Sequence, residues 1–297
     1  MSAAGASTVQ ARNDRLRRRK IVNRVMEGLA WLAAAIAVCI LGVVVVSVAR
    51  KGASELNLDL LTKAPVPFAP AGVAQGLGNA FVGTLVIVGI ATAMALPVGI
   101  LIAIYLYEFA RPSIRSAVTL ALDVLNGIPA IVIGIFVFGL IVVGRGQSGF
   151  AGAFALSILM LPLVARSTME VLALVPGSLR EASLGLGVPR WRTTLSIVLP
   201  QTIGGVVTGA TLAVARVAGE TAPLLFTSAL VGNQINWDPH TALQTVPVAI
   251  FELSESPDPN DHARAWAAAF VLLMFILFAS LGARWLATRS RRKLMAR

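Results

Sequence analysis

The chain has few charged residues, one cysteine and two histidines, and each shortage excludes a class of protein. Asp, Glu, Lys and Arg make up 13% of its 297 residues, whereas a soluble domain carries about 25%. So few charges cannot cover a water-facing surface, which excludes a soluble globule and a disordered chain. Cys39 is alone in an apolar run, so no disulfide can form within the chain, and we expect a small buried side chain there. His240 and His262 have no metal-ligand spacing, and we predict no metal site.

The sequence also lacks the motifs of common nucleotide-binding and hydrolytic sites. It contains no Gly-Lys pair, so the glycine-rich loop that ends in Gly-Lys-Ser or Gly-Lys-Thr and holds nucleotide phosphates cannot form. A Gly-x-Ser-x-Gly turn and a His-Glu-x-x-His helix are absent too. We therefore predict that the chain has no catalytic residues and no ATPase site, and that it is not an enzyme.

What the sequence has in abundance is apolar, nearly uncharged stretches. Hydrophobic residues make up 57% of the chain, and the mean hydropathy is +0.80. A helix that spans a bilayer needs about 20 apolar residues. Six stretches meet this length: residues 28–49, 79–107, 118–143, 146–165, 197–227 and 265–283. We predict an all-α polytopic membrane protein with six transmembrane helices.

Some of these stretches have a second interpretation. Residues 28–49 could be a secretory signal, because basic residues precede them and Ser47-Val48-Ala49 resembles a cleavage site. Their apolar length favours an uncleaved anchor, since a signal core has only about 7–15 residues. Residues 221–237 could form a short re-entrant segment, and residues 241–253 a short interfacial helix.

The positions of Lys and Arg predict the orientation of the chain. With six helices, 18 basic residues fall on one side of the membrane and five on the other. Because cytoplasmic loops carry the excess of Lys and Arg, we predict that both termini are cytoplasmic. The net charge of +11 then reflects membrane topology, and we predict no nucleic-acid partner.

These features divide the chain into five parts. Residues 1–24 form a basic cytoplasmic tail, residues 25–50 the first transmembrane helix, and residues 51–75 an external connection rich in Pro and Gly. Residues 76–288 hold the remaining helices, with a cytoplasmic loop at residues 172–196. Residues 289–297 form a second basic tail.

The cytoplasmic loop contains a distinctive spacing of residues. Its pattern consists of Glu181-Ala182-Ser183, then Gly187, and then Ile197-x-Leu199-Pro200. We expect Ser178 to cap a short helix that carries Glu181 in its first turn, where the helix dipole favours a carboxylate. Gly185 and Gly187 should end this helix, and Pro189 should begin a second one. The pattern predicts an exposed helix pair that can dock in a groove of a partner.

This spacing resembles the signature loop of the membrane subunits of bacterial binding-protein-dependent ABC importers. The chain matches it at Glu181, Ala182, Gly187, Ile197, Leu199 and Pro200, and departs from it at Ser183. The resemblance covers about residues 76–288 and implies the type I (MetI-like) importer core plus one N-terminal helix. It also implies that the loop is the coupling helix that seats in an ATPase subunit.

A narrower resemblance concerns the permease subunits of phosphate importers. It rests on the segments at residues 126–134, 166–170 and 216–227. In that family, the arginines that match Arg166 and Arg216 are implicated in phosphate translocation. Membrane arginines usually face the interior of a helix bundle and mark a pathway, and the planar guanidinium suits phosphate oxygens.

Each of these arginines has a glutamate four residues later, namely Glu170 and Glu220. The spacing places both members of a pair on one helical face, with Arg216 near the middle of the fifth helix. Our hypothesis is that phosphate competes with each glutamate for its arginine, so that Arg166, Glu170, Arg216 and Glu220 line the translocation path. The pairs could instead only hold two helices together. Asp123 needs no special role, because a place near the cytoplasmic end of the third helix accounts for it.

The resemblance implies a complex in the bacterial cytoplasmic (inner) membrane. Its other members would be a second, homologous permease subunit, ATPase subunits that bind ATP and Mg²⁺, and an extracytoplasmic phosphate-binding protein. Two alternatives remain open. One is an importer of another oxyanion, such as sulfate or molybdate, and the other is a secondary transporter or a membrane scaffold.

Overall fold

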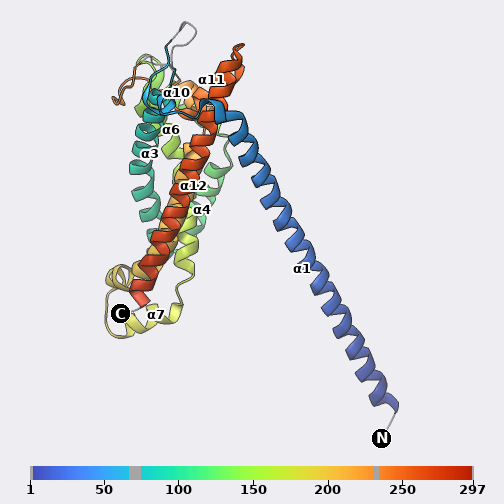
Figure 1. The fold of residues 1–297 in the computed structure, drawn as a ribbon. Coiled ribbons are helices and arrows are strands. Elements are labelled where there is room, and N and C mark those ends of the chain that lie inside the picture. Colours follow the sequence, from blue (N-terminus) through green and yellow to red (C-terminus); the bar gives the residue numbers. More distant parts are fainter. Residues whose placement is uncertain (1–2, 67–74, 230–233, 296–297) are drawn as a thin grey trace. The chain divides into compact units, whose positions relative to one another are not determined.

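The computed structural model describes residues 3–66, 75–229 and 234–295, in which every regular element is a helix and none is a strand (Figure 1). The prediction of an all-α chain is therefore confirmed. The chain divides into two compact units, Met1–Lys51 and Gly52–Arg297.

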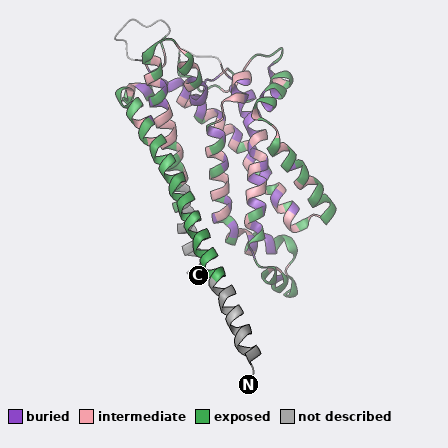
Figure 2. Cartoon of the chain, turned by 90° about the vertical axis from the view of Figure 1, so that its right-hand side faces the viewer, coloured by how far each residue is buried: buried purple, intermediate pink, exposed green. Residues whose placement is uncertain are grey.

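The first unit is one helix, α1 (Ala3–Gly52), which contains the charge-free stretch at residues 28–49. Most of its apolar side chains are exposed, Trp31 to 73% (Figure 2), and Val48 near its end is buried. An exposed apolar surface of this length is expected of a helix that faces lipid. Cys39 is also exposed. Our expectation of a buried thiol was wrong, because a single helix has no core in which to bury it.

The second unit holds the remaining helices. Those of eight residues or more are α3 (Gly78–Ile104), α4 (Pro112–Gly127), α5 (Ala130–Val137), α6 (Gly149–Ala173), α7 (Gly177–Gly185), α9 (Leu199–Ala218), α11 (Val246–Glu255) and α12 (Pro259–Met295). The short ones are η1 (Ala53–Glu55), α2 (Leu58–Thr62), α8 (Arg190–Thr193) and α10 (Ala222–Thr227). Single π-helical turns end α3 and α5 and precede α9, at η2 (Tyr105–Phe109), η3 (Phe138–Val142) and η4 (Thr194–Val198).

The core of this unit lies between α3 and α6. Ile87 of α3 and Leu156, Met160 and Val164 of α6 are fully buried there. The two helices approach closely because Gly99 has no side chain, and a Cβ atom at that position would lie 2.9 Å from Val164 Cγ1. Small residues at such contacts are a common device in membrane helix packing.

Five helices are long and apolar enough to cross a membrane, and α4 with α5 makes a sixth span if this bent pair is taken as one. The two helices of the pair meet at an angle of 94°. The bend follows from Pro129, because the residue before a proline is driven out of helical geometry. Ile128 accordingly has φ −71° and ψ 130°. The structure therefore fits the predicted six spans, and the third of them is broken.

Two further predicted helices differ from the structure. The fourth was expected to end at residue 165, but α6 continues to Ala173 and includes Arg166 and Glu170. The fifth was expected to continue to residue 227, but α9 ends at Ala218 and a separate helix, α10, begins at Ala222. A short helix was also expected within residues 241–253, and α11 (Val246–Glu255) is present there.

Candidate functional site

Two helix breaks meet at one small cavity. The first separates α4 from α5 at Ile128 and Pro129, and the second separates α9 from α10 at residues 219–221. The cavity has a volume of about 50 Å³ and is lined by Leu125, Asn126, Ile128, Ala130, Leu159, Leu163, Arg216, Val217 and Glu220. Non-helical backbone at membrane depth is tolerated where it lines a cavity or is buried in protein.

The position of the cavity along α6 gives its depth. Leu159 and Leu163 lie in the middle of this 25-residue helix, which is long enough to span a bilayer. The lining residue Arg216 is therefore near mid-depth. We had expected it at the centre of one continuous helix, but it lies close to the end of α9.

The predicted pairing of Arg216 with Glu220 is not observed. Glu220 lies beyond the last residue of α9, Ala218, so the helical spacing that would bring the two side chains together does not apply. The helix ends here because Pro223, at the start of α10, has no N–H group and its ring would clash with the preceding turn. Within the described residues, Arg216 is exposed and forms no ion pair, and both residues line the cavity separately.

Arg166 also has a different partner from the one predicted. Its Nε lies 3.2 Å from Oδ1 of Asp123 on α4, while Glu170 is exposed. Arg166 follows Leu163 by three residues, which corresponds to about 4.5 Å along the axis of α6. The ion pair therefore lies roughly one helical turn from the cavity, on the side of the α7 loop. Sequence spacing suggested the nearest carboxylate along the chain, whereas the fold supplies one from another helix.

The cavity offers donors suited to an anion, beside one carboxylate, that of Glu220. Arg216 has N–H donors in a planar fork and keeps its charge, and Asn126 adds an amide. In the part of the chain that the structure describes, no group of three His, Cys, Asp or Glu side chains could hold a metal ion.

The segment beyond the second break is fixed by Gln147. Its Nε2 donates to the carbonyl oxygens of Leu225 and Phe226, at 3.4 and 3.3 Å, and its Oε1 accepts from the N–H of Ala229 at 3.0 Å. On α5, Gly134 allows the backbone of Pro223 to approach, since a Cβ atom there would lie 2.6 Å from Pro223 Cα. These contacts hold α10 against the helices around it.

The signature loop forms the predicted helix pair. Helix α7 ends at Gly185, Gly187 has a left-handed φ of +79°, and Pro189 precedes α8. The expected cap is wrong, because the helix begins at Gly177 after Pro176, and Ser178 lies inside it. Ser183, the departure from the family pattern, is buried and its hydroxyl lies 2.9 Å from that of Thr193, which joins α7 to α8.

The outer surface of this loop carries large apolar side chains among charged ones, which include Glu181, Arg190 and Arg192. Leu186 is 85% exposed, and Trp191, Leu184 and Leu179 are exposed as well. Of the signature residues, Glu181, Ala182 and Gly187 are exposed, whereas Ile197, Leu199 and Pro200 are half-buried at the start of the next span. Exposed apolar side chains that gather on one loop typically mark an interaction site.

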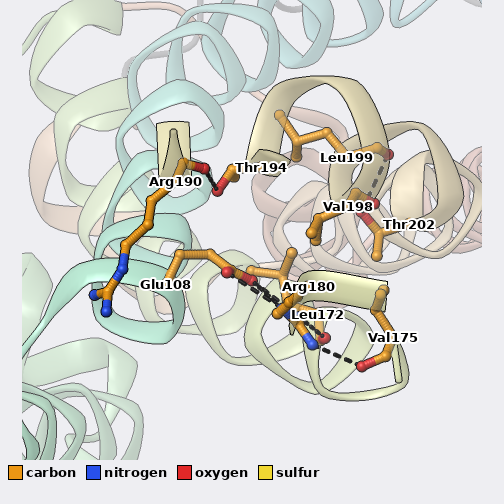
Figure 3. A network of polar contacts seen from close by, with 9 residues as sticks. All are labelled: Glu108, Leu172, Val175, Arg180, Arg190, Thr194, Val198, Leu199 and Thr202. Carbon is orange, nitrogen blue, oxygen red and sulfur yellow. Dashed lines mark hydrogen bonds and ion pairs between the residues drawn. The ribbon is translucent and has the colours of Figure 1, made fainter. Parts of the chain in front are cut away.

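A polar network attaches the loop to the membrane helices. Figure 3 shows Arg180 of α7 between Glu108, in the π-helical turn that ends α3, and carbonyl groups at the end of α6 and just after it. Its Nη2 lies 2.9 Å from Glu108 Oε1 and its Nε 3.1 Å from the same oxygen, while Nη1 donates to Val175 O at 2.7 Å and Nη2 to Leu172 O at 2.9 Å. Both side chains are largely buried.

Sequence reasoning missed this network. Neither Glu108 nor Arg180 was assigned a role from the sequence. The available signal was a lone acidic residue at the cytoplasmic end of a predicted helix, opposite a loop with arginines. A preceding tyrosine, Tyr107, adds to it, because its ring lies beneath the guanidinium groups of Arg115 and Arg180 at 4.6 and 5.2 Å.

Comparison with known proteins shows consistent relatives. Residues 95–292 match the family model described as "Binding-protein-dependent transport system inner membrane component". The chain is 38% identical to the phosphate transport system permease protein PstA of Pasteurella multocida over 90% of its length and 94% of the relative. It is 42% identical to the phosphate transport system permease protein PstA 1 of Mycobacterium tuberculosis, over 75% of the chain and 74% of the relative.

Solved structures share the fold. An inward-facing MetNI methionine ABC transporter aligns with a TM-score of 0.56 and 16% identity, over 72% of this chain and 93% of that one. A bacterial ABC transporter that imports alginate aligns with a TM-score of 0.55 and 16% identity, over 72% and 79% of the two chains. The expected importer permease fold is thereby confirmed.

Proposed function

Because the chain belongs to the family of binding-protein-dependent transport system inner membrane components, and within it to the PstA permeases, we propose that it forms half of the path by which an ATP-driven importer moves inorganic phosphate across the inner membrane. The other half is a second, homologous permease subunit. Two ATPase subunits, which bind ATP and Mg²⁺, dock on the cytoplasmic side, and a phosphate-binding protein docks outside. Both termini of this chain lie in the cytoplasm.

The observation that carries the proposal is the place of Arg216. It lines a cavity near mid-depth, where two helix breaks meet, and its charge has no carboxylate partner among the described residues. A charge at the bilayer centre is costly unless it faces a bundle interior or a water-filled space. Arg216 is exposed in the single chain. In the membrane, the face that carries it therefore either contacts the second permease or lines the translocation path.

The second arginine extends the path toward the cytoplasm. Phosphate that leaves Arg216 next meets Arg166, where it competes with Asp123 for the guanidinium. Our initial hypothesis of competition with Glu170 is thus replaced by competition with a carboxylate on α4. Glu220 and Glu170, which form no ion pair in the described part of the chain, keep the path from holding the anion tightly. Weak contact is required, because an anion that binds strongly does not leave.

The exposed loop around α7 and α8 is the docking point for an ATPase subunit. Glu181, Ala182 and Gly187 occupy the outward surface, where a partner can reach them. ATP-driven closure of the ATPase subunits displaces this loop, and the membrane helices follow. The chain supplies the translocation path and the loop that transmits the movement, and ATP is hydrolysed in the partner subunit.

The test is uptake of radiolabelled phosphate by vesicles that contain the assembled complex with Arg216→Gln or Arg216→Lys. We expect Arg216→Gln to abolish uptake and Arg216→Lys to retain part of it, because lysine keeps the charge and loses the planar fork. Arg145→Gln, which removes an exposed arginine outside the spans, is the matched control. Wild-type uptake by both Arg216 variants would remove this residue from the path. Competition by unlabelled sulfate or molybdate as strong as by phosphate would contradict the choice of substrate.

A further inference from the structure

We propose that Arg180 and Glu108 are a positioning pair that makes the α7–α8 loop and the α3–α6 core move as one body during transport. The proposal rests on the function proposed above, because it concerns how displacement of the loop reaches the path. Neither residue belongs to the signature spacing of the loop.

Apart from residues 174–176, which join α6 to α7 along the chain, the loop reaches the membrane helices by two routes. One is continuous helix, since residues 190–218 run from α8 through η4 into α9, which carries Arg216. The other is the side chain of Arg180. It is the point where α7, the end of α3 and the end of α6 are held together, through Glu108 and the carbonyl oxygens of Leu172 and Val175.

Apolar burial contributes little to this attachment. Ser183 is the only residue of α7 that is buried, and its hydroxyl is joined to Thr193 of α8. The α7–α8 pair is therefore a unit with an exposed apolar surface, and its polar connection to α3 and α6 runs through Arg180. Without that connection, a displaced loop would move α9 directly, whereas its link to α6 would be the backbone of residues 174–176 alone and its link to α3 through Glu108 would be lost.

The chemistry of the connection favours rigidity. Arginine binds a carboxylate through a planar fork, and such charge-assisted hydrogen bonds are short and strongly directional. The exposed fractions are 18% for the Arg180 side chain and 10% for that of Glu108. Loss of either partner leaves a buried charge without compensation. The ring of Tyr107 lies against both Arg180 and Arg115, so the start of α4 is tied to the same point.

The experiment uses the reconstituted complex with its binding protein and compares Glu108→Gln, Arg180→Gln and the double variant. Two quantities are measured on each: the phosphate transported per ATP hydrolysed, and the ATP hydrolysis in the absence of binding protein. Coupling between sites is typically worth a factor of about 5 or more, so we expect the transport ratio to fall about fivefold in each single variant, with hydrolysis uncoupled from transport. Glu108→Gln keeps an oxygen that can accept from Arg180, which protects assembly.

The double variant distinguishes a pair from two separate residues. If Arg180 and Glu108 act together, the transport ratio of the double variant is no lower than the lower of the two ratios measured for the single variants. Arg111→Gln, an exposed arginine on the same side of the membrane, is the control and should keep the wild-type ratio.

An unchanged ratio in both single variants would overturn the proposal. So would losses of transport and hydrolysis that simply follow the amount of assembled complex, since these indicate a role in stability alone. If the wild-type complex moves no phosphate, the proposed substrate is wrong. The dependence of ATP hydrolysis on the binding protein then still tests the pair.

Discussion

Replacement of Gly205 by alanine should force apart α6 and α9, the helices that carry Arg166 and Arg216. A Cβ atom at position 205 would lie 2.5 Å from Val171 Cγ1 and 2.7 Å from Cγ2, well inside the separation of about 3.5–4.0 Å at which carbon atoms attract. Val171 is β-branched and has one strongly preferred rotamer in a helix, so it cannot turn away. The methyl group fits only if the helices separate.

The magnitude follows from a comparison with a second glycine. Overpacking of a tight contact costs about 1–3 kcal/mol, while alanine gains up to about 1 kcal/mol over glycine in helix propensity. Gly89 of α3 has no atom within 4 Å of its added Cβ, so Gly89→Ala receives the propensity gain without the clash. The difference in unfolding free energy between the two variants should therefore be about 1–3 kcal/mol, with Gly205→Ala the less stable.

The assay is equilibrium unfolding of the purified chain in mixed detergent micelles, followed by circular dichroism. Val171→Ala removes the two methyl groups that clash, so the double variant should recover stability relative to the sum of the single effects, by at least about 0.5 kcal/mol. A Gly205→Ala chain as stable as Gly89→Ala, or a double variant with additive losses, would refute the reasoning.

Three more changes test separate features of the second unit. Gly187→Ala introduces a side chain at φ +79°, which costs about 1–2 kcal/mol. It should weaken co-purification of the ATPase subunits, whereas Gly282→Ala, in open space, should not, and equal recovery of ATPase with both variants would contradict this. Gln147→Leu leaves the Ala229 N–H and two carbonyl groups without their partner, at a cost of about 1–3 kcal/mol. It should speed hydrogen exchange at residues 225–229, and unchanged protection there would show that other contacts hold α10. Burial raises the pKa of Glu252 above 4.5, against the opposing hydrogen bond from Gln244. The folded state then binds the Glu252 proton more tightly than the unfolded state does. The stability that the protonated carboxyl group contributes is therefore present below the unfolded pKa and is lost as pH rises through the folded pKa. Unfolding measured from pH 4 to pH 8 should show Glu252→Gln gaining stability relative to wild type as pH rises, and parallel curves would exclude this titration.

The sequence predicted well those elements whose limits are local. Helix α3 was expected at residues 79–107 and is present at Gly78–Ile104 with a π-helical turn to Phe109, because turn residues precede it and a charge follows it. The helix pair of the signature loop was predicted equally well, since Gly187 and Pro189 fix where each helix stops or starts.

The predictions failed where a charge or a break depends on another part of the fold. Arg166 was taken as the end of a span, but α6 continues through it because Asp123 supplies the opposite charge from α4. The end of α9 was missed although Pro223 signalled it, because the apolar run on both sides favoured one long helix. The meeting of the two helix breaks at one cavity depends on tertiary packing, and no local sequence pattern predicts it.

The partner of Arg166 changes what passage of an anion would do to the chain. A carboxylate at position 170 would belong to the same helix as the arginine, and its displacement would leave the contacts between helices as they were. Asp123 belongs to α4, just before the break that lines the cavity. If an anion took the place of Asp123 at Arg166, it would therefore release α4 from α6 at that point. We infer that occupancy of the path and the packing of α4 against α6 are linked, so that Asp123→Asn should weaken this helix contact even without substrate.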